Sequence, residues 1–220
     1  MKYREDIKIK KKELISIIQN TKSFTNPEIE LEQYTIDAVC AIDIIFFAGL
    51  EFNDITNKLV FDLGAGTGRL SLSSAFLSPI RIISVDIDDN ALKILKLNAI
   101  HLQVEKNILP LCADVKNLQF SPKFLSSSPK ITTIMNPPFG VQNPGADRPF
   151  LETAFSISDI IYSIHLAHEN VHKFIRNFAR KNGWHIDYVL PYNMVLEKSF
   201  EFHEKKRKQI DVNLYRFKKI

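Results

Sequence analysis

The residues with the clearest chemical potential are Asn136, Pro137, Pro138 and Phe139, which follow an apolar run at residues 131–135. The two prolines have no backbone N–H and a fixed φ, so a β-strand has to end here. The first of them also pushes Asn136 toward an extended conformation. We therefore expect a stiff loop at the carboxyl end of a strand, which is where open α/β sheets bind ligands.

Such a loop can activate an amine. The exocyclic nitrogen of adenine, like an amide nitrogen, is a weak nucleophile because its lone pair is delocalised, and it carries two N–H donors. The side-chain oxygen of Asn136 can accept from one N–H and the backbone carbonyl of Pro137 from the other. Phe139 can stack on the planar group that carries the nitrogen. The alternative interpretation is a Pro-Pro turn after a buried strand, without any chemistry.

A glycine-rich turn, residues 64–68, follows another apolar run at residues 59–63. A strand, this turn and a helix over residues 69–77 would place backbone N–H groups and a positive dipole end around one pocket. The spacing of Gly64, Gly66 and Gly68 is not the dinucleotide fingerprint, whose third glycine comes one residue later. It matches the D-x-G-x-G-x-G pattern of methyltransferases that bind S-adenosylmethionine.

Two acids end the next predicted strands. Asp86 belongs to the strand at residues 81–87 and lies roughly 20 residues past the glycines, where an acid binds ribose hydroxyls in nucleotide-binding folds. Asp88 can cap a helix over residues 90–102. Asp114 follows a strand at residues 108–113 and, with Val115 beside it, could accept from an adenine amino group. A strand-end cap and a loop aspartate are the alternatives for Asp86 and Asp114.

The order of these elements alternates between strand and helix. It predicts an α/β fold with a doubly wound, mostly parallel seven-stranded sheet of the Rossmann-like class I methyltransferase type. Strands at residues 184–190 and 209–217 would form an antiparallel C-terminal hairpin. In such a sheet the glycine turn and the Asn136 loop are neighbours across the topological switch point. Two independent motifs thus converge on one pocket.

We expect a single domain, residues 1–220, with an N-terminal helical region over residues 1–50 and a catalytic core over residues 51–220. Residues 120–130 are expected to be an exposed connection, because they are rich in serine and proline. Residues 141–148 are expected to form a mobile lid that orders on substrate.

Composition and charge limit the function classes. The 220 residues carry a net charge of +4, which is compatible with nucleic acid but does not argue for it. Cys40 and Cys112 form no C-x-x-C pair and the histidines show no metal spacing, so no metal site is predicted. Both thiols are expected to be buried, in a reducing cytoplasm. The apolar run at residues 38–50 is too short to span a bilayer, so no membrane contact is expected.

A basic stretch near the C-terminus follows Phe200 and Phe202. Next to the pocket it would neutralise the phosphates of RNA. A solvated hairpin turn is the alternative. The residues of this stretch are Lys205, Lys206, Arg207 and Lys208.

Taken in order, the motifs of the chain resemble those of one family. They are Leu31-Glu32-Gln33-Tyr34, the turn at residues 62–68, Val85-Asp86-Ile87-Asp88, Asp114-Val115, the Asn136 loop, Phe150-Leu151, Tyr162-Ser163-Ile164-His165, and Phe202-His203 before the basic stretch. The family is the methyltransferase-like protein five family, the adenine-N6 methyltransferases of small-subunit rRNA in archaea and eukaryotes. The resemblance extends from about Leu31 to Phe217.

This resemblance implies S-adenosylmethionine as cofactor and RNA as substrate. The implied catalytic residues are those of the Asn136 loop. The implied cofactor site comprises Gln33, Gly64, Gly66, Thr67, Gly68, Asp86, Ile87, Asp114 and Val115. The family usually has Pro-Thr after the tyrosine, whereas Thr35 and Ile36 stand here, which displaces the hydroxyl by one residue. We therefore leave both out of the cofactor site.

The resemblance also implies a partner. Eukaryotic members work with a small zinc-binding activator that adds a strand to the sheet edge. In the usual strand order this edge is the strand at residues 108–113, and an apolar edge without charges invites such pairing.

Three other functions stay open at this stage. A protein glutamine-N5 methyltransferase solves the same chemical problem, although such enzymes generally resemble an Asn-Pro-Pro-Tyr pattern. A DNA adenine methyltransferase would normally need an added target-recognition domain, for which there is no room. A catalytically silent RNA-binding scaffold would not need the intact glycine turn and Asn136.

Overall fold

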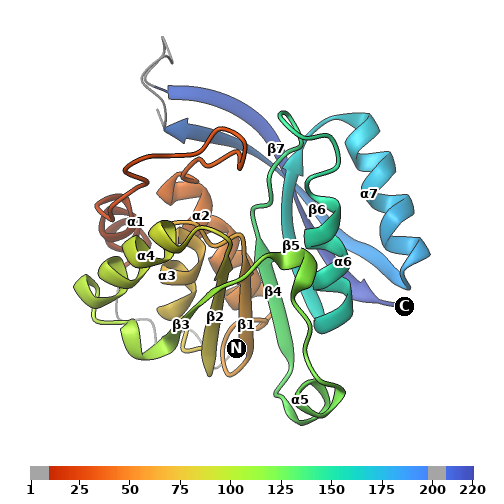
Figure 1. The fold of residues 1–220 in the computed structure, drawn as a ribbon, viewed down its shortest axis with the longest axis horizontal. Coiled ribbons are helices and arrows are strands. Elements are labelled where there is room, and N and C mark those ends of the chain that lie inside the picture. Colours follow the sequence, from red (N-terminus) through yellow and green to blue (C-terminus); the bar gives the residue numbers. More distant parts are fainter. Residues whose placement is uncertain (1–9, 198–206) are drawn as a thin grey trace.

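The computed structural model describes residues 10–197 and 207–220, and the side chains of Glu197, Arg207 and Lys208 are not among the described ones. A central sheet is covered by helices on both faces (Figure 1). Its strands are β1 Leu59–Leu63, β2 Arg81–Asp86, β3 Ile108–Cys112, β4 Ile131–Met135, β5 Ile160–Leu166, β6 Trp184–Glu197 and β7 Arg207–Lys219.

Seven α-helices accompany the strands in the described chain. They are α1 Lys11–Gln19, α2 Ala38–Phe46, α3 Arg69–Ala75, α4 Asp89–His101, α5 Pro122–Ser127, α6 Arg148–Ile157 and α7 Glu169–Lys181. A π-helical turn, Phe47–Glu51, extends α2, and two 3-10 turns, Glu105–Asn107 and Val115–Asn117, flank β3. Within residues 10–197 and 207–220, no helix is both long and apolar enough to cross a membrane.

The strand order is β3-β2-β1-β4-β5-β7-β6, so the predicted seven-stranded doubly wound sheet is confirmed. The first five strands in the chain pair in parallel, while β7 pairs antiparallel with both β5 and β6. From β1 the chain continues to β2 and β3 on one side of β1, and it then crosses to β4 on the other side. This reversal creates the expected switch point between β1 and β4. The strand β3 is an edge, as predicted.

Two hydrophobic cores lie on opposite faces of the sheet. One contains buried residues of α1 to α4, such as Leu14 and Ile45, and the other contains buried residues of α6 and α7, such as Leu151 and Ile175. The strands β1 and β4 are buried at every position, because helices cover both of their faces.

Local signals begin and end the helices. The side chain of Asp37 accepts from Cys40 N and caps α2, and Asp88 accepts from Asn90 N and caps α4, as predicted for the latter. Gly183, which follows the C-cap residue Asn182 of α7, has a φ of +78°, and a left-handed residue at this position ends a helix.

The connection at residues 120–130 is exposed or half-buried at every position, as expected. It contains α5, because Ser121 caps this helix, Pro122 starts it and Phe124 stacks on Phe120 at 5.2 Å. Two other expectations are wrong in detail, the burial of Cys112 and the length of the C-terminal hairpin. The thiol of Cys112 is exposed on the edge strand, whereas Cys40 is buried as predicted.

The C-terminal hairpin is longer than predicted. The strands β6 and β7 extend toward the basic stretch, so Arg207 and Lys208 begin β7 instead of forming a turn. Lys205 and Lys206 lie outside the described residues. The expected RNA contact of this stretch therefore stays a prediction.

A buried polar cluster joins this hairpin to the parallel part of the sheet. Arg216 of β7 donates to Asp54 Oδ2 from Nη2 at 2.8 Å and from Nε at 3.0 Å. Tyr162 of β5 donates to the same oxygen at 2.6 Å, and Asp187 of β6 also pairs with the guanidinium. The residues Arg216 and Asp54 are 5% and 8% exposed, so water does little to weaken their interaction.

We expect Asp54→Ala to lower the free energy of unfolding by about 3 kcal/mol, because it removes the main acceptor of a buried guanidinium. Urea denaturation measures this loss. The matched control is Asp89→Ala, which breaks an exposed pair with Lys93 and should cost no more than about 0.5 kcal/mol. Similar losses in both variants would contradict the stabilising role of the cluster.

Candidate active site

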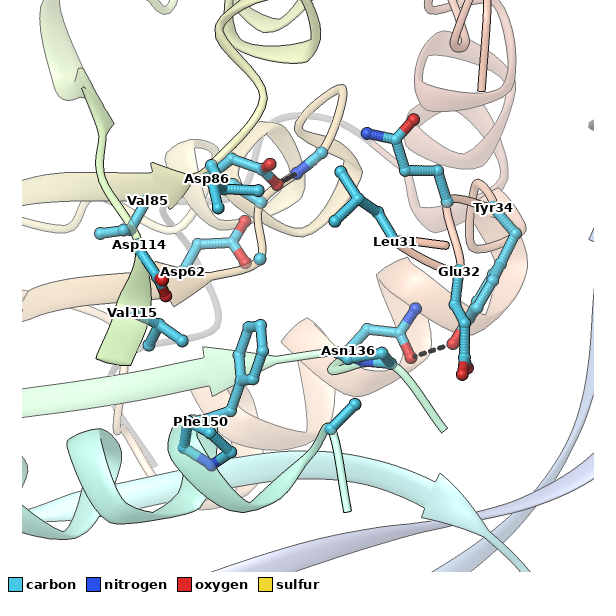
Figure 2. Close-up of a pocket in the computed structure, with 18 of the residues that line it drawn as sticks. Leu31, Glu32, Tyr34, Asp62, Val85, Asp86, Asp114, Val115, Asn136 and Phe150 are labelled. Atoms are coloured by element: carbon cyan, nitrogen blue, oxygen red, sulfur yellow. Dashed lines mark hydrogen bonds between the residues drawn. The ribbon is translucent and has the colours of Figure 1, made fainter. Parts of the chain in front are cut away.

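A cavity of about 500 Å³ lies at the carboxyl ends of the central strands. This volume suits a ligand of nucleotide size. Figure 2 shows Asp62, Asp86 and Asp114 in one part of the cavity and Asn136 with Tyr34 in another. The parallel register explains this meeting, because Leu63 of β1 pairs with both Val85 and Met135. The residues that follow these three are therefore neighbours at one edge of the sheet.

The glycine turn is bonded to β2. Gly64 N and Ala65 N both donate to Val85 O at 2.9 Å, and Gly66 N donates to Asp86 Oδ2 at 2.7 Å. Gly66 has a φ of +53°, and a Cβ at this position would lie 2.9 Å from Cζ of Phe24. The turn therefore needs glycine both for its backbone conformation and for its close approach to an aromatic ring.

Asp86 is held in a fixed orientation. Its Oδ1 accepts from Asp88 N at 2.9 Å while its Oδ2 accepts from Gly66 N. Burial raises the pKa of Asp86, and these two N–H donors partly offset that effect. A carboxylate that is fixed and partly desolvated at a strand end is well placed to accept from the hydroxyls of a ribose.

Asp62 lines the cavity, although it was not among the predicted site residues. It is 1% exposed, and Ser71 Oγ donates to its Oδ2 at 2.5 Å. Its Oδ1 is buried and has no hydrogen-bond partner among the described residues. An acceptor without a donor beside a cavity fits the ammonium group of S-adenosylmethionine, which would supply N–H donors. The acid of the D-x-G-x-G-x-G pattern was the available sequence signal.

Asp114 and Val115 line the cavity after β3. The side chain of Asp114 accepts from Lys116 N at 2.9 Å, so it also caps the short turn that follows. The capping role and a contact with a ligand are compatible, because a carboxylate has several acceptor positions.

Residues 136–143, here called the target loop, follow β4 and begin with Asn136. Tyr34 donates its hydroxyl to Asn136 Oδ1 at 3.2 Å, and its ring stacks on Phe139 with centroids 5.3 Å apart. Burial raises the pKa of Tyr34 well above its usual value, so the hydroxyl stays protonated as a donor. This contact fixes the rotamer of the amide and leaves a second lone pair of Oδ1 for a substrate.

The cavity brings together most of the predicted site residues. Those that line it are Gln33, Gly64, Gly66, Thr67, Gly68, Asp86, Ile87, Asp114, Val115, Asn136 and Pro138. Pro137 and Phe139 do not line it, although they belong to the same loop. The stacking of Phe139 on an adenine stays a prediction, as do the catalytic and binding roles of the whole set.

Sequence reasoning missed several lining residues. Phe24 and Phe150 lie against the glycine turn, and Glu32 and Tyr34 stand on either side of the predicted Gln33. The sequence showed Glu32 and Tyr34 only as members of the motif at residues 31–34, because both contact a loop about a hundred positions away. Thr35 lines the cavity as well, and its Oγ1 is 2.5 Å from Ser23 Oγ.

No group of three or more potential metal ligands occurs in the described part of the chain.

The chain is similar to known proteins in both sequence and structure. A family model for ribosomal protein L11 methyltransferase (PrmA) matches residues 46–121. The uncharacterized protein MJ0284 of Methanocaldococcus jannaschii is 38% identical over 216 residues, which cover 96% of this chain and 95% of that protein. The crystal structure of PH1948 from Pyrococcus horikoshii superposes with a TM-score of 0.85, at 37% identity, and covers 96% of this chain and 98% of its own.

The fold, the cavity and these matches define a methyltransferase of the Rossmann-like class. The rRNA N(6)-adenosine-methyltransferase METTL5 of Danio rerio is 36% identical over 215 residues, which cover 95% of this chain and 99% of that protein. The chain belongs to the METTL5 family of rRNA N(6)-adenosine-methyltransferases. The predicted family resemblance is thereby confirmed.

The titration of Asp62 gives a prediction for stability. Burial, with a smaller effect from Asp86, raises the pKa of Asp62 to about 7, against about 3.9 in an unfolded chain. The folded protein then binds more protons than the unfolded one between these values, so this carboxyl group makes stability fall as the pH rises from about 4 to about 7. Asp62→Asn removes this contribution.

We expect Asp62→Asn to gain stability relative to the unsubstituted protein when the pH is raised from 5 to 8. Urea denaturation at both pH values measures the change, and contributions from groups that do not interact with Asp62 cancel in the comparison. An equal difference in stability at pH 5 and pH 8 would mean that Asp62 does not titrate in this range.

Proposed function

We propose that this protein transfers a methyl group from S-adenosylmethionine to the N6 amine of adenine in small-subunit rRNA. The observation that carries the proposal is the shared cavity of the glycine turn, Asp86 and Asn136. The names of the METTL5 relatives support rRNA adenine as the substrate. We also propose that one domain, residues 1–220, performs the reaction and that the protein acts in the cytoplasm.

The residues around the glycine turn, here called the cofactor half of the cavity, would bind the cofactor and orient it. Asp86 would accept from the ribose hydroxyls, and Asp62 Oδ1 would accept from the ammonium group that its orphaned position fits. Asp114 would accept from the amino group of the cofactor's adenine, next to Val115. When bound, the cofactor supplies a methyl group on a sulfonium, which is electrophilic and needs no metal.

The residues of the target loop would orient the nucleophile, which is the N6 amine of adenine. Asn136 Oδ1 and the carbonyl of Pro137 would accept from the two N–H groups of N6, which turns its lone pair toward the methyl carbon. Transfer would form the N–C bond while the C–S bond breaks with its electron pair left on the thioether sulfur, and the N6 proton would pass to water. A strong general base is not needed, because this proton becomes acidic only on methylation. Positioning is thus the main contribution of the enzyme.

Two contacts with other molecules belong to the proposal. The basic stretch Lys205, Lys206, Arg207 and Lys208 would hold the RNA backbone while the target base is flipped out of its stack. The edge strand β3 would bind a small zinc-binding activator, since Leu109 and Leu111 are 49% and 37% exposed and the strand carries no charge.

The substrate class is tested by incubating the protein with methyl-labelled S-adenosylmethionine and separate RNA, DNA and protein fractions. We expect the label in RNA. Label in a protein glutamine would favour the glutamine-N5 alternative, and no transfer to any fraction would favour a silent scaffold.

We expect Asn136→Ala to lower the rate of methyl transfer about 100-fold or more, because it removes one of two acceptors that hold the amine. Binding of S-adenosylmethionine, measured by calorimetry, should stay unchanged. Asn177→Ala, on the exposed side of α7, is a matched control that should keep full activity. An active Asn136→Ala variant would contradict the proposed role of the loop.

We expect Asp86→Ala to weaken the binding of S-adenosylmethionine about 10-fold or more, since hydrogen bonds to a charged acceptor are lost. Asp89→Ala, three positions further on and exposed, should bind with the affinity of the unsubstituted protein. Equal affinities of the Asp86 variant and the unsubstituted protein would rule out the ribose contact.

A further inference from the structure

Residues 30–34, here called the strap, lie across the target loop. Glu30 O accepts from Asn143 Nδ2 at 3.2 Å at one end of the strap, and Tyr34 donates to Asn136 at the other end. The central contact is made by Glu32, whose position beside Tyr34 and Asn136 is visible in Figure 2. Three residues of one short segment thus contact the loop that would hold the acceptor amine.

Both carboxylate oxygens of Glu32 are used by this loop. Its Oε2 accepts from Phe139 N at 2.8 Å, and its Oε1 accepts from Gln142 N at 2.8 Å. Pro137 and Pro138 have no N–H, so Phe139 carries the first backbone N–H after Asn136 that any group can hold. Hydrogen bonds to a charged acceptor are the stronger kind. The carboxylate therefore fixes the path of the chain directly after the two prolines.

The backbone of Glu32 is strained, since its φ is +51°, which is rare for residues other than glycine. The next residue, Gln33, contacts the other half of the site. Its Nε2 donates to Asp88 Oδ2 at 2.9 Å, and Asp88 N in turn donates to Asp86 Oδ1 at 2.9 Å. Glu32 thus holds the target loop, while the next residue, Gln33, contacts the segment that follows β2 on the cofactor side.

We propose that Glu32 is a positioning residue for methyl transfer, which fixes the target loop relative to the cofactor half of the cavity. This inference rests on the proposed function, because it concerns the geometry of the same reaction. Although Glu32 lines the cavity, both of its carboxylate oxygens accept from backbone N–H groups of the loop, so it acts through this backbone. Its removal therefore lowers the rate of the chemical step and leaves cofactor binding intact.

The test is Glu32→Gln, which keeps the size of the side chain. Its amide oxygen can accept from one of the two N–H groups, but its NH₂ group then faces the other donor. We expect kcat on RNA to fall about 10-fold or more, with the Kd for S-adenosylmethionine and the Tm unchanged. The matched control Glu28→Gln replaces an exposed carboxylate that makes no hydrogen bond or ion pair with the described residues. It leaves the backbone hydrogen bonds of Glu28 with Gln33 in place and should keep the original kcat.

A kcat of Glu32→Gln equal to that of Glu28→Gln would overturn the proposal. Cofactor affinity that falls in step with kcat would also overturn it, because Glu32 would then act on the whole site. A merely structural role would lower the Tm and would not separate kcat from cofactor binding.

Amide hydrogen exchange gives a readout that does not depend on activity. In Glu32→Gln the amides of Phe139 and Gln142 exchange faster than in Glu28→Gln, since they have lost a charged acceptor. Unchanged protection of both amides would overturn the proposal. An unsubstituted protein that methylates no RNA would contradict the proposed function, and the exchange rates would still decide whether Glu32 holds the loop.

Discussion

Leu63 lies at the centre of the parallel register, because it pairs with Val85 of β2 on one side and with Met135 of β4 on the other. The residues that come next on the three strands are Gly64, Asp86 and Asn136. The glycine turn, the acid and the target loop therefore meet at one edge of the sheet. A shift of either pairing by one residue would also turn the buried side chains of a strand to the other face. The core thus enforces the geometry of the site.

The site contains several buried hydrogen-bond acceptors, and taking them out of water costs much solvation free energy. Burial raises the pKa of both Asp62 and Asp86, and a neighbouring carboxylate adds to the effect in each case, Asp86 for Asp62 and Asp88 for Asp86. The strap adds the carboxylate of Glu32 at the opposite side of the cavity, where backbone N–H groups satisfy it. A cavity lined with acceptors and backbone N–H groups suits a cationic, hydroxyl-bearing cofactor next to an amine. The strained backbone of Glu32 and the Asp62 oxygen that has no hydrogen-bond partner among the described residues both occur where function is expected.

Much of this arrangement could be predicted from the sequence, because it depends on local signals. Pro137 and Pro138 end a strand, the glycines define a turn, and Asp88 caps a helix in any context. The switch point followed from the order of strands and helices. The contacts of Glu32 and Tyr34 could not be predicted in this way, since they join positions about a hundred residues apart and depend on tertiary packing. The exposure of Cys112 was missed although its strand was predicted to be the edge, because the apolar sequence of this strand does not show that most of its side chains are left uncovered.

The length of the β6–β7 hairpin was also missed, because Pro191 and Asn193 within β6 read as turn residues. They are accommodated because β6 is an edge strand of the described sheet. The basic stretch of the C-terminal region stays a sequence-based hypothesis, while the family relationship supports the RNA that it would bind.

The central claim is that the cavity presents an exocyclic adenine amine to a methyl donor. The most direct measurement is mass spectrometry of the nucleosides from small-subunit rRNA that has been incubated with the protein and isotope-labelled S-adenosylmethionine. The account predicts that the labelled methyl group is found in N6-methyladenosine. A labelled methyl group on a ring nitrogen, on a ribose oxygen or on another base would contradict it.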